Sequence, residues 1–272
     1  MKKIYFLVIS ALLTLSFTTK QISWVALGDS ITYLNDHPEQ TYYRVQKGYM
    51  TRTVEALPEL SYINHGYNGW TSLRVAQRIE DLGIQSADLY TVFLGTNDWW
   101  HGDSLGTYAD YELNTGPETI NGAFRVILDK LKSLNPDARI VLITPMQRGD
   151  FVYIARTTNN AYGSYKAKNG RTLEEVANAI KYIGEQNGLE VLDLYHQKAL
   201  NVGNAVKFKY LKNPETGEYQ NYGYPAYTEI PYNPDTDQYP YPLAAIGVTY
   251  DGLHPSDKGN EIISKLLVKM LK

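Results

Sequence analysis

Short apolar runs alternate with amphipathic stretches along this chain from Gln21 onward. Five of the runs are compact and rich in β-branched or aromatic residues, which is typical of buried strands. They predict strands at residues 22–27, 61–64, 88–94, 139–144 and 189–194. Gly28 follows the first run and Pro145 follows the fourth, and both residues favour the end of a strand at these points.

The stretches between these runs place apolar residues three or four positions apart, which predicts amphipathic helices. The expected helices cover residues 50–57, 72–82, 117–134, 172–186 and 257–271. In the third of them, Ile120, Phe124 and Ile127 share one face. Pro58 and Gly83 are expected to end the first two helices.

Strand and helix alternate five times, which predicts an α/β fold with a parallel sheet covered by helices on both faces. We expect one domain over residues 21–272, built as a three-layer α/β/α sandwich. In such folds ligands bind beyond the carboxyl ends of the strands, so functional residues should directly follow strands. Residues 99–116 and 201–242 show little periodicity and are expected to form long loops.

The first twenty residues differ from the rest. Lys2 and Lys3 precede an apolar run, and a polar stretch ends at Lys20. This pattern is typical of a secretory signal peptide, so residues 1–20 predict export to the periplasm or the extracellular space. The apolar run is short for a membrane span, which needs about 20 residues. No stable membrane anchor is expected after cleavage; a retained anchor or a buried first helix is the alternative.

Composition and charge exclude several classes of function. The chain carries a formal net charge of -3, and its Lys and Arg residues form no long runs, so nucleic acid is not an expected partner. There are no cysteines, and therefore no disulfides. No His-Glu-x-x-His motif or phosphate-binding loop occurs, and His37, His65, His101 and His196 are dispersed. We expect neither a metal nor another cofactor.

Three side chains could form a nucleophilic site. Ser30 follows the first predicted strand in Gly28-Asp29-Ser30, where a base could activate its hydroxyl. Asp251 and His254 precede the last helix, separated by a turn with Gly252, so a carboxylate could orient an imidazole. Each has a purely structural alternative: the Ser as a helix cap, and the Asp and His as turn residues.

Two further segments could stabilise an oxyanion. Asn97 lies in Gly95-Thr96-Asn97-Asp98 after the third strand, and its amide could donate a hydrogen bond to developing negative charge. A Gly66-Tyr67-Asn68-Gly69 turn follows the second strand, where a glycine lets a backbone N–H approach a ligand. Taken singly, an Asx turn and a glycine-rich turn explain these segments equally well. Their joint placement after three successive strands is more specific.

In this arrangement the chain resembles the SGNH hydrolases, also called the GDSL esterase/lipase family. The resemblance spans nearly all of residues 21–272, with Ile31 standing where the family name has Leu. It implies a flavodoxin-like fold with a five-stranded sheet and no metal. It also implies a triad of Ser30, Asp251 and His254, and an oxyanion hole formed by Ser30, Gly69 and Asn97, with Gly66 the weaker candidate. The Gly-x-Ser-x-Gly elbow of the related α/β-hydrolases is missing around Ser30.

The expected activity is hydrolysis of carboxylic esters through an acyl-enzyme, with Asp29, Trp99, Trp100 and His101 as possible residues of the substrate pocket. The chain has 24 Tyr and 4 Trp, many of them in the two long loops. Their flat faces suit sugar rings, which favours a small-molecule or polysaccharide ester, and acetyl groups above all, but they could equally pack the loops. The alternatives are a lipase, lysophospholipase or thioesterase with an apolar acyl channel, and a glycan-binding protein without catalysis.

Overall fold

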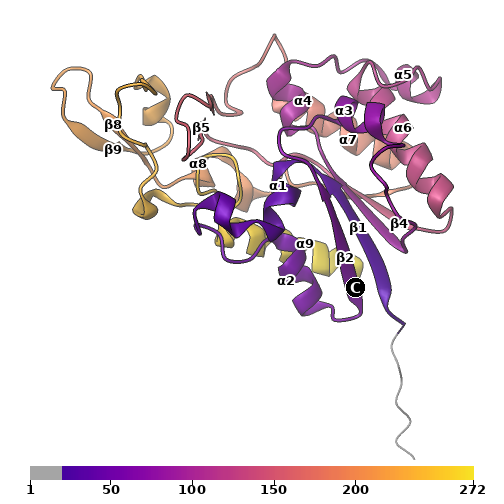
Figure 1. The fold of residues 1–272 in the computed structure, drawn as a ribbon. Helices are drawn as coiled ribbons and strands as arrows, with labels where there is room; N and C mark the ends of the chain where they lie inside the picture. The colour runs from indigo at the N-terminus through magenta and orange to yellow at the C-terminus, as the bar shows by residue number, and fades with distance from the viewer. Residues whose placement is uncertain (1–19) are drawn as a thin grey trace, which may run out of the picture.

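The structure, a computed structural model, describes residues 20–272. Five strands form a parallel sheet in the order β2-β1-β3-β4-β7. Figure 1 labels β2, β1 and β4 of this sheet. This is the strand order of flavodoxin-like folds, so the predicted fold class is confirmed. The strands are β1 Ile22–Gly28, β2 Leu60–Gly66, β3 Leu89–Phe93, β4 Arg139–Ile143 and β7 Glu190–Leu192.

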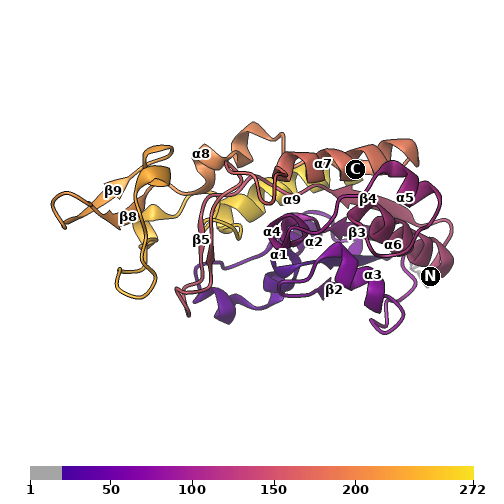
Figure 2. The ribbon, with the colours of Figure 1, turned by 90° about the horizontal axis from the view of Figure 1, so that it is seen from above.

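Helices cover both faces of the sheet (Figure 2). On one face lie α3 (Ser72–Arg78), α6 (Ile120–Leu134) and α7 (Leu173–Gln186), whose apolar side chains share a core with Val25 and Leu27 of β1. On the other face lie α2 (Tyr49–Ala56) and α9 (Asp257–Leu271), whose core includes Trp24 and Ala26. Successive residues of β1 therefore point into opposite cores, which explains its nearly unbroken apolar sequence.

The helix boundaries follow from their capping residues. The helix expected at 117–134 begins at Ile120 because the Thr119 side chain accepts a hydrogen bond from the Gly122 N–H. Thr172 and Glu175 form a capping box at the start of α7. The helix expected to run to Leu82 ends at Arg78, where the backbone continues as turns that bring Ile79 and Ile84 into the core.

Both segments expected to be long loops contain regular elements. Residues 99–116 include the second half of α4 (Thr96–His101) and all of α5 (Tyr108–Glu112). Residues 201–242 include α8 (Val202–Ala205) and an antiparallel hairpin of β8 (Lys209–Lys212) and β9 (Tyr219–Tyr222), which projects from one end of the molecule in Figures 1 and 2. We call residues 201–242 the tyrosine lobe.

The remaining elements are short. Helix α1 (Ser30–Tyr33) follows β1 directly, and β5 (Phe151–Val152) pairs with β6 (Asn160–Ala161). Five 3-10 helices complete the described residues: η1 Leu34–Asp36, η2 Pro38–Thr41, η3 Lys198–Leu200, η4 Ala226–Glu229 and η5 Leu243–Ala245.

The tyrosine lobe has a small core of its own. Leu211, Tyr227 and Tyr241 are buried there together with Val152 of β5. Four more tyrosines pack against this cluster: Tyr165, Tyr222, Tyr232 and Tyr239. The tyrosines of the lobe therefore act first as packing residues, the second of the two roles that their composition allowed.

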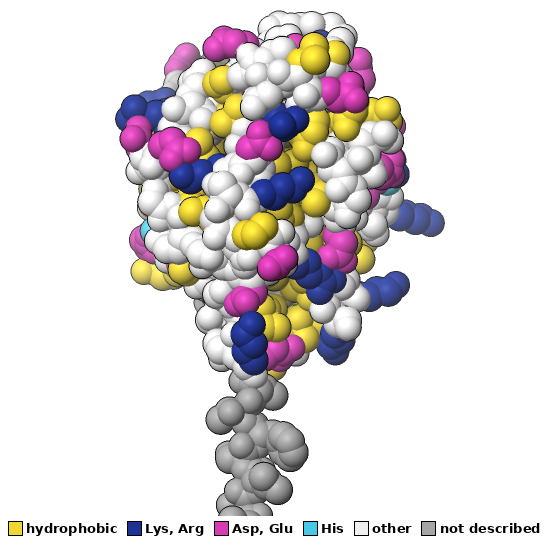
Figure 3. Space-filling model, turned by 90° about the vertical axis from the view of Figure 1, so that its right-hand side faces the viewer, with side chains coloured by type: hydrophobic (Ala, Val, Ile, Leu, Met, Phe, Trp, Pro, Cys, Tyr) yellow, Lys and Arg dark blue, Asp and Glu magenta, His cyan; other side chains and the backbone are white. Residues whose placement is uncertain are grey.

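Two further features concern the surface and the N-terminus. On the face seen in Figure 3, basic and acidic side chains are interspersed among hydrophobic ones, without a large patch of one sign. Within residues 20–272, no helix combines the length and apolarity needed to cross a membrane. The signal peptide expected at residues 1–20 lies, except for Lys20, outside the described residues.

Candidate active site

Ser30 is the first residue of α1, at the carboxyl end of β1. The Asp29 side chain accepts a hydrogen bond from the Ile31 N–H at 2.9 Å and so caps this helix. The turn is tight, because a Cβ at Gly28 would lie 2.2 Å from the Thr32 hydroxyl. The sequence Gly-Asp-Ser thus places the Ser30 hydroxyl at the edge of the sheet.

Asp251 and His254 lie on one turn before α9. Asp251 is fully buried, and its Oδ2 lies 2.7 Å from Nδ1 of His254. Its Oδ1 accepts hydrogen bonds from the backbone N–H groups of Leu253 and His254. Gly252 between them has φ +91°, and a Cβ there would lie 1.7 Å from the Asp150 carbonyl oxygen, so only glycine fits.

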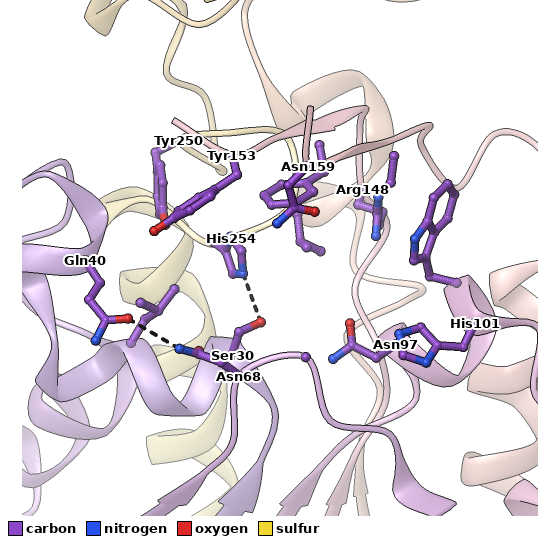
Figure 4. A pocket seen from close by; sticks show the side chains of 16 residues that line it. Ser30, Gln40, Asn68, Asn97, His101, Arg148, Tyr153, Asn159, Tyr250 and His254 are labelled. Atoms are coloured by element: carbon purple, nitrogen blue, oxygen red, sulfur yellow. Dashed lines mark hydrogen bonds between the residues drawn. The ribbon is translucent and has the colours of Figure 1, made fainter. Parts of the chain in front are cut away.

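The three side chains form one hydrogen-bonded series across 224 positions of sequence. His254 Nε2 lies 2.9 Å from Ser30 Oγ (Figure 4). With the Nδ1 proton held by the Asp251 carboxylate, the lone pair of Nε2 faces the Ser30 hydroxyl. The rings of Phe151 and Tyr250 pack against the imidazole, with centroids 5.5 and 5.8 Å away.

Candidate oxyanion donors lie beside Ser30. Asn97 Nδ2 donates one hydrogen bond to the Trp70 carbonyl at 2.9 Å, which orients the amide and leaves its second proton free. Gly69 has φ +73°, and a Cβ there would meet no atom within 4 Å because it would point into open space. A Cβ at Gly66 would instead lie 2.1 Å from the Tyr33 backbone nitrogen, so Gly66 permits close packing of α1.

These residues line a cavity of about 380 Å³. Figure 4 places Gln40 and Asn68 on one side of Ser30 and Asn97, His101 and Arg148 on the other. The lining residues are Ser30, Leu34, Gln40, Asn68, Gly69, Asn97, Trp100, His101, Arg148, Phe151, Tyr153, Asn159, Ala161, Tyr250, Leu253 and His254.

Two residues predicted for the pocket do not line it. Asp29 is buried beneath Ser30 as the cap of α1, and burial raises the pKa of its carboxyl group to about 6. Trp99 is 1% exposed, and its indole N–H donates to the Arg171 carbonyl at 3.0 Å. Because α4 is a helix, Trp99 and Trp100 point in different directions, and Trp100 and His101 line the cavity.

Seven polar or aromatic residues that line the cavity were not predicted as site residues: Gln40, Asn68, Arg148, Phe151, Tyr153, Asn159 and Tyr250. Arg148 follows β4 as Asn97 follows β3. Its position shortly after a strand could therefore have indicated that it belongs to the site. Burial lowers the pKa of its guanidinium to about 10. Tyr153 and Asn159 flank the turn between β5 and β6, which local periodicity does not reveal.

Asp150 connects the tyrosine lobe to this site. The Asp150 carboxylate pairs with Lys209 of β8 at 2.7 Å and accepts hydrogen bonds from the Gly163 N–H and the Tyr165 hydroxyl. The Tyr241 hydroxyl donates to the Asp150 carbonyl. This segment runs beside the triad, because the Val152 N–H donates to the Asp251 carbonyl at 3.2 Å.

No group of three or more His, Cys, Asp or Glu side chains within residues 20–272 is arranged to hold a metal ion. The chemistry available from the described side chains is a hydroxyl beside an imidazole, an imidazole beside a carboxylate, and N–H donors beside the hydroxyl. This combination suits acyl transfer to and from Ser30.

The fold and this group of side chains define the SGNH class of hydrolases. The sequence model of the GDSL-like lipase/acylhydrolase family matches residues 26–262, so the chain belongs to that family. Membership implies hydrolysis of ester bonds. No curated protein sequence matches the chain.

Solved structures agree with this assignment. A possible lipase from Chitinophaga pinensis is 58% identical, with a TM-score of 0.91, over 92% of this chain and 97% of that one. An acetyl-xylooligosaccharide esterase from Geobacillus shares the fold, with a TM-score of 0.52 and 19% identity over 92% of this chain and 94% of its own. A Lactobacillus plantarum protein is 21% identical, with a TM-score of 0.58, over 93% and 97% of the two chains.

Proposed function

We propose that this protein is an exported serine esterase that removes short acyl groups, acetyl above all, from carbohydrate. The observation that carries the catalytic part is the hydrogen-bonded series of Asp251, His254 and Ser30 at the wall of one cavity. Export rests on the signal-like composition of residues 1–20.

In the proposed mechanism, Ser30 Oγ attacks the ester carbonyl while His254 Nε2 accepts its proton. Asp251 stays ionised, holds the imidazole in the required tautomer and stabilises the imidazolium. The oxyanion is bound by the backbone N–H groups of Ser30 and Gly69 and by the Asn97 amide. His254 then protonates the leaving alcohol, and a water molecule repeats the sequence on the acyl-enzyme.

The cavity supports a short acyl group. Its volume of about 380 Å³ has to hold both the acyl group and part of the alcohol. Four amide side chains (Gln40, Asn68, Asn97 and Asn159) are distributed around it, whereas a long alkyl chain favours a continuous apolar wall.

Aromatic side chains in the cavity support a carbohydrate alcohol. Trp100, Tyr153 and Tyr250 line it, and rings of this kind stack on the apolar faces of sugars. The fold also occurs in an acetyl-xylooligosaccharide esterase, so this architecture can accommodate such substrates. The 58% identical protein is described as a possible lipase, which keeps longer acyl esters as the second candidate.

The test is a hydrolysis assay on protein lacking residues 1–20. It compares 4-nitrophenyl acetate with 4-nitrophenyl dodecanoate, using the Ser30→Ala variant as the control. We expect Ser30-dependent activity that prefers the acetate. Preference for the dodecanoate supports a lipase or thioesterase instead. Absence of Ser30-dependent activity on both esters and on acetylated oligosaccharides contradicts the esterase proposal and favours a glycan-binding protein.

A further inference from the structure

Arg148 is a buried cation without a counter-ion. It is 1% exposed, and no carboxylate among residues 20–272 forms an ion pair with it. The two acidic groups that act on its charge most strongly are engaged elsewhere: Asp251 with His254 and Asp150 with Lys209. Burying an unpaired charge costs free energy, so we expect the Arg148 guanidinium to lower the stability of the fold and not to raise it.

The hydrogen bonds of Arg148 are also incomplete. Its Nη2 donates to the Tyr162 carbonyl at 3.2 Å, and its buried Nε has no partner among the described residues. A guanidinium has five N–H donors in a planar fork, so most of its capacity is unused. Donors of this kind bind a planar carboxylate through two parallel hydrogen bonds.

Two indole rings hold the guanidinium in place. Its central carbon lies 5.5 Å from the ring centroids of both Trp99 and Trp100. Trp99 is locked in the core by its hydrogen bond to the Arg171 carbonyl. The guanidinium is therefore preorganised, and little side-chain entropy remains to be lost when a ligand binds.

The guanidinium faces the cavity that contains Ser30. Arg148 lines it on the side of Asn97 and His101 (Figure 4). At this end the cavity adjoins a groove of about 480 Å³, which shares Gly69 and His101 with it. The charged groups that line this groove are Arg74, Arg78 and Asp103, and Arg78 pairs with Asp81 at 3.6 Å.

We propose that Arg148 binds a carboxylate carried by the substrate, so that this enzyme prefers acidic esters over neutral ones. The inference rests on the proposed esterase function and narrows its substrate class. A single planar cation suits a carboxylate better than a phosphate group, which recruits several donors. The carboxylate can come from the acyl group, as in a half-ester of a dicarboxylic acid, or from the alcohol, as in a uronic acid.

Two pairs of substrates distinguish these sources. For the alcohol, acetate release is measured from the fully acetylated methyl glucuronoside and from its neutral glucuronamide. For the acyl group, ethanol release is measured from ethyl hydrogen succinate and from ethyl succinamate. Within each pair the shape is nearly constant and the charge changes, so the ratio of kcat/KM values reports recognition of the carboxylate.

The variants are Arg148→Gln and Arg148→Lys, the second of which keeps the charge if the first fails to fold. We expect the acid-to-amide ratio to fall roughly ten- to a hundredfold in Arg148→Gln and less in Arg148→Lys. Lys168→Gln is the matched control, because Lys168 lies 4.1 Å from the Trp100 ring but does not line the cavity. It should keep the ratio of the parent enzyme.

Binding separates this inference from the proposed function. Calorimetry on the Ser30→Ala protein compares methyl glucuronoside and ethyl hydrogen succinate with their neutral amides, methyl glucuronamide and ethyl succinamate, and needs no turnover. Tighter binding of one acid, lost in Ser30→Ala/Arg148→Gln, supports the inference even if no hydrolysis is found. Equal binding and equal hydrolysis of acid and amide in both pairs overturn it. A preference for the acid that persists in the Arg148 variants also overturns the inference. So does a fall in kcat/KM of the same size on all four esters in Arg148→Gln.

Discussion

Lys209 Nζ lies 2.7 Å from Asp150 Oδ2, with only 3% and 14% of the two side chains exposed. This ion pair joins the hairpin of the tyrosine lobe to the segment that runs beside the triad. The Lys209 ammonium also lies over the rings of Tyr227 and Tyr232, at 5.4 and 5.7 Å from their centroids. The lobe thus stabilises the backbone around Asp150, which carries Phe151 and contacts Asp251.

Removal of one partner of this pair should destabilise the protein. In Lys209→Met the Asp150 carboxylate stays buried without its cation, at a cost of about 3–5 kcal/mol in the free energy of unfolding. Urea unfolding measures the loss, and Lys212→Met on the same strand, where the side chain is exposed, is the control. A loss equal to that of Lys212→Met would show that the pair does not hold the lobe.

Ser30→Ala should abolish ester hydrolysis and preserve the fold. Among the described residues, the only side-chain partner of the Ser30 hydroxyl is His254 Nε2. The change to alanine therefore removes one hydrogen bond, and no group besides His254 loses a partner. Turnover of 4-nitrophenyl acetate and the melting temperature check the two parts of this prediction. Ser86→Ala, at an exposed position, is the control, and activity near the parent level in Ser30→Ala would remove Ser30 from the mechanism.

Asn97→Ala should lower kcat by about a hundredfold to a thousandfold with little change in KM, because an oxyanion donor acts mainly in the transition state. Asn68→Ala is the matched control, since Asn68 is an amide on the same cavity that donates to Gln40 at 3.3 Å. We expect a smaller effect there. A rise in KM without a fall in kcat would make Asn97 a residue that binds the substrate's ground state.

Gly69→Ala and Gly83→Ala form a pair that separates strain from catalysis. Both glycines have positive φ, +73° and +63°, and a Cβ on either would meet no atom within 4 Å. Each change should therefore cost about 1 kcal/mol of stability or slightly more. Only Gly69→Ala should reduce hydrolysis, because Gly69 lines the cavity that contains Ser30 and Gly83 does not. Equal activity of the two variants would argue against Gly69 as an oxyanion donor.

Stability should fall as pH rises from about 4 to 7, owing in part to Asp98. Burial raises the pKa of this carboxyl group from 3.8 to about 7, while Ser72 donates to its Oδ1 and Oδ2 has no partner. The folded state then holds a proton that the unfolded chain releases, so the stabilisation is full below the unfolded pKa and is lost as pH passes the folded pKa.

Asp98→Asn mimics the protonated carboxyl group and should flatten this dependence. The change corresponds to at most about 4 kcal/mol over the whole range. Unfolding free energies of the parent and Asp98→Asn proteins at pH 5 and pH 8 provide the test, with the histidines contributing equally to both. Parallel pH profiles of the two proteins would contradict the raised pKa.

The structure also shows why some site residues could be predicted and others could not. Ser30, Asn97 and Gly69 follow strands at short range, so hydrophobic periodicity and the motif blocks placed them at one edge of the sheet. Trp99 lies two residues after Asn97, and this proximity in sequence predicts a place in the pocket. Residues 96–101 form a helix instead, and this helix directs the Trp99 side chain into the core. The aromatic character of Trp99 suits a pocket and a core equally, so it did not indicate this direction.

The sequence by itself determined the order of strands and helices, the family, and the residues of the proposed triad. These properties depend on local periodicity and on short motifs that are continuous along the chain. Only the tertiary structure decided that Arg148 shares a cavity with Ser30 and that the tyrosines of residues 201–242 form a core. The physical reason is distance along the chain: each of these facts arises from packing between remote segments, and burial by such packing leaves no periodic signal in the sequence.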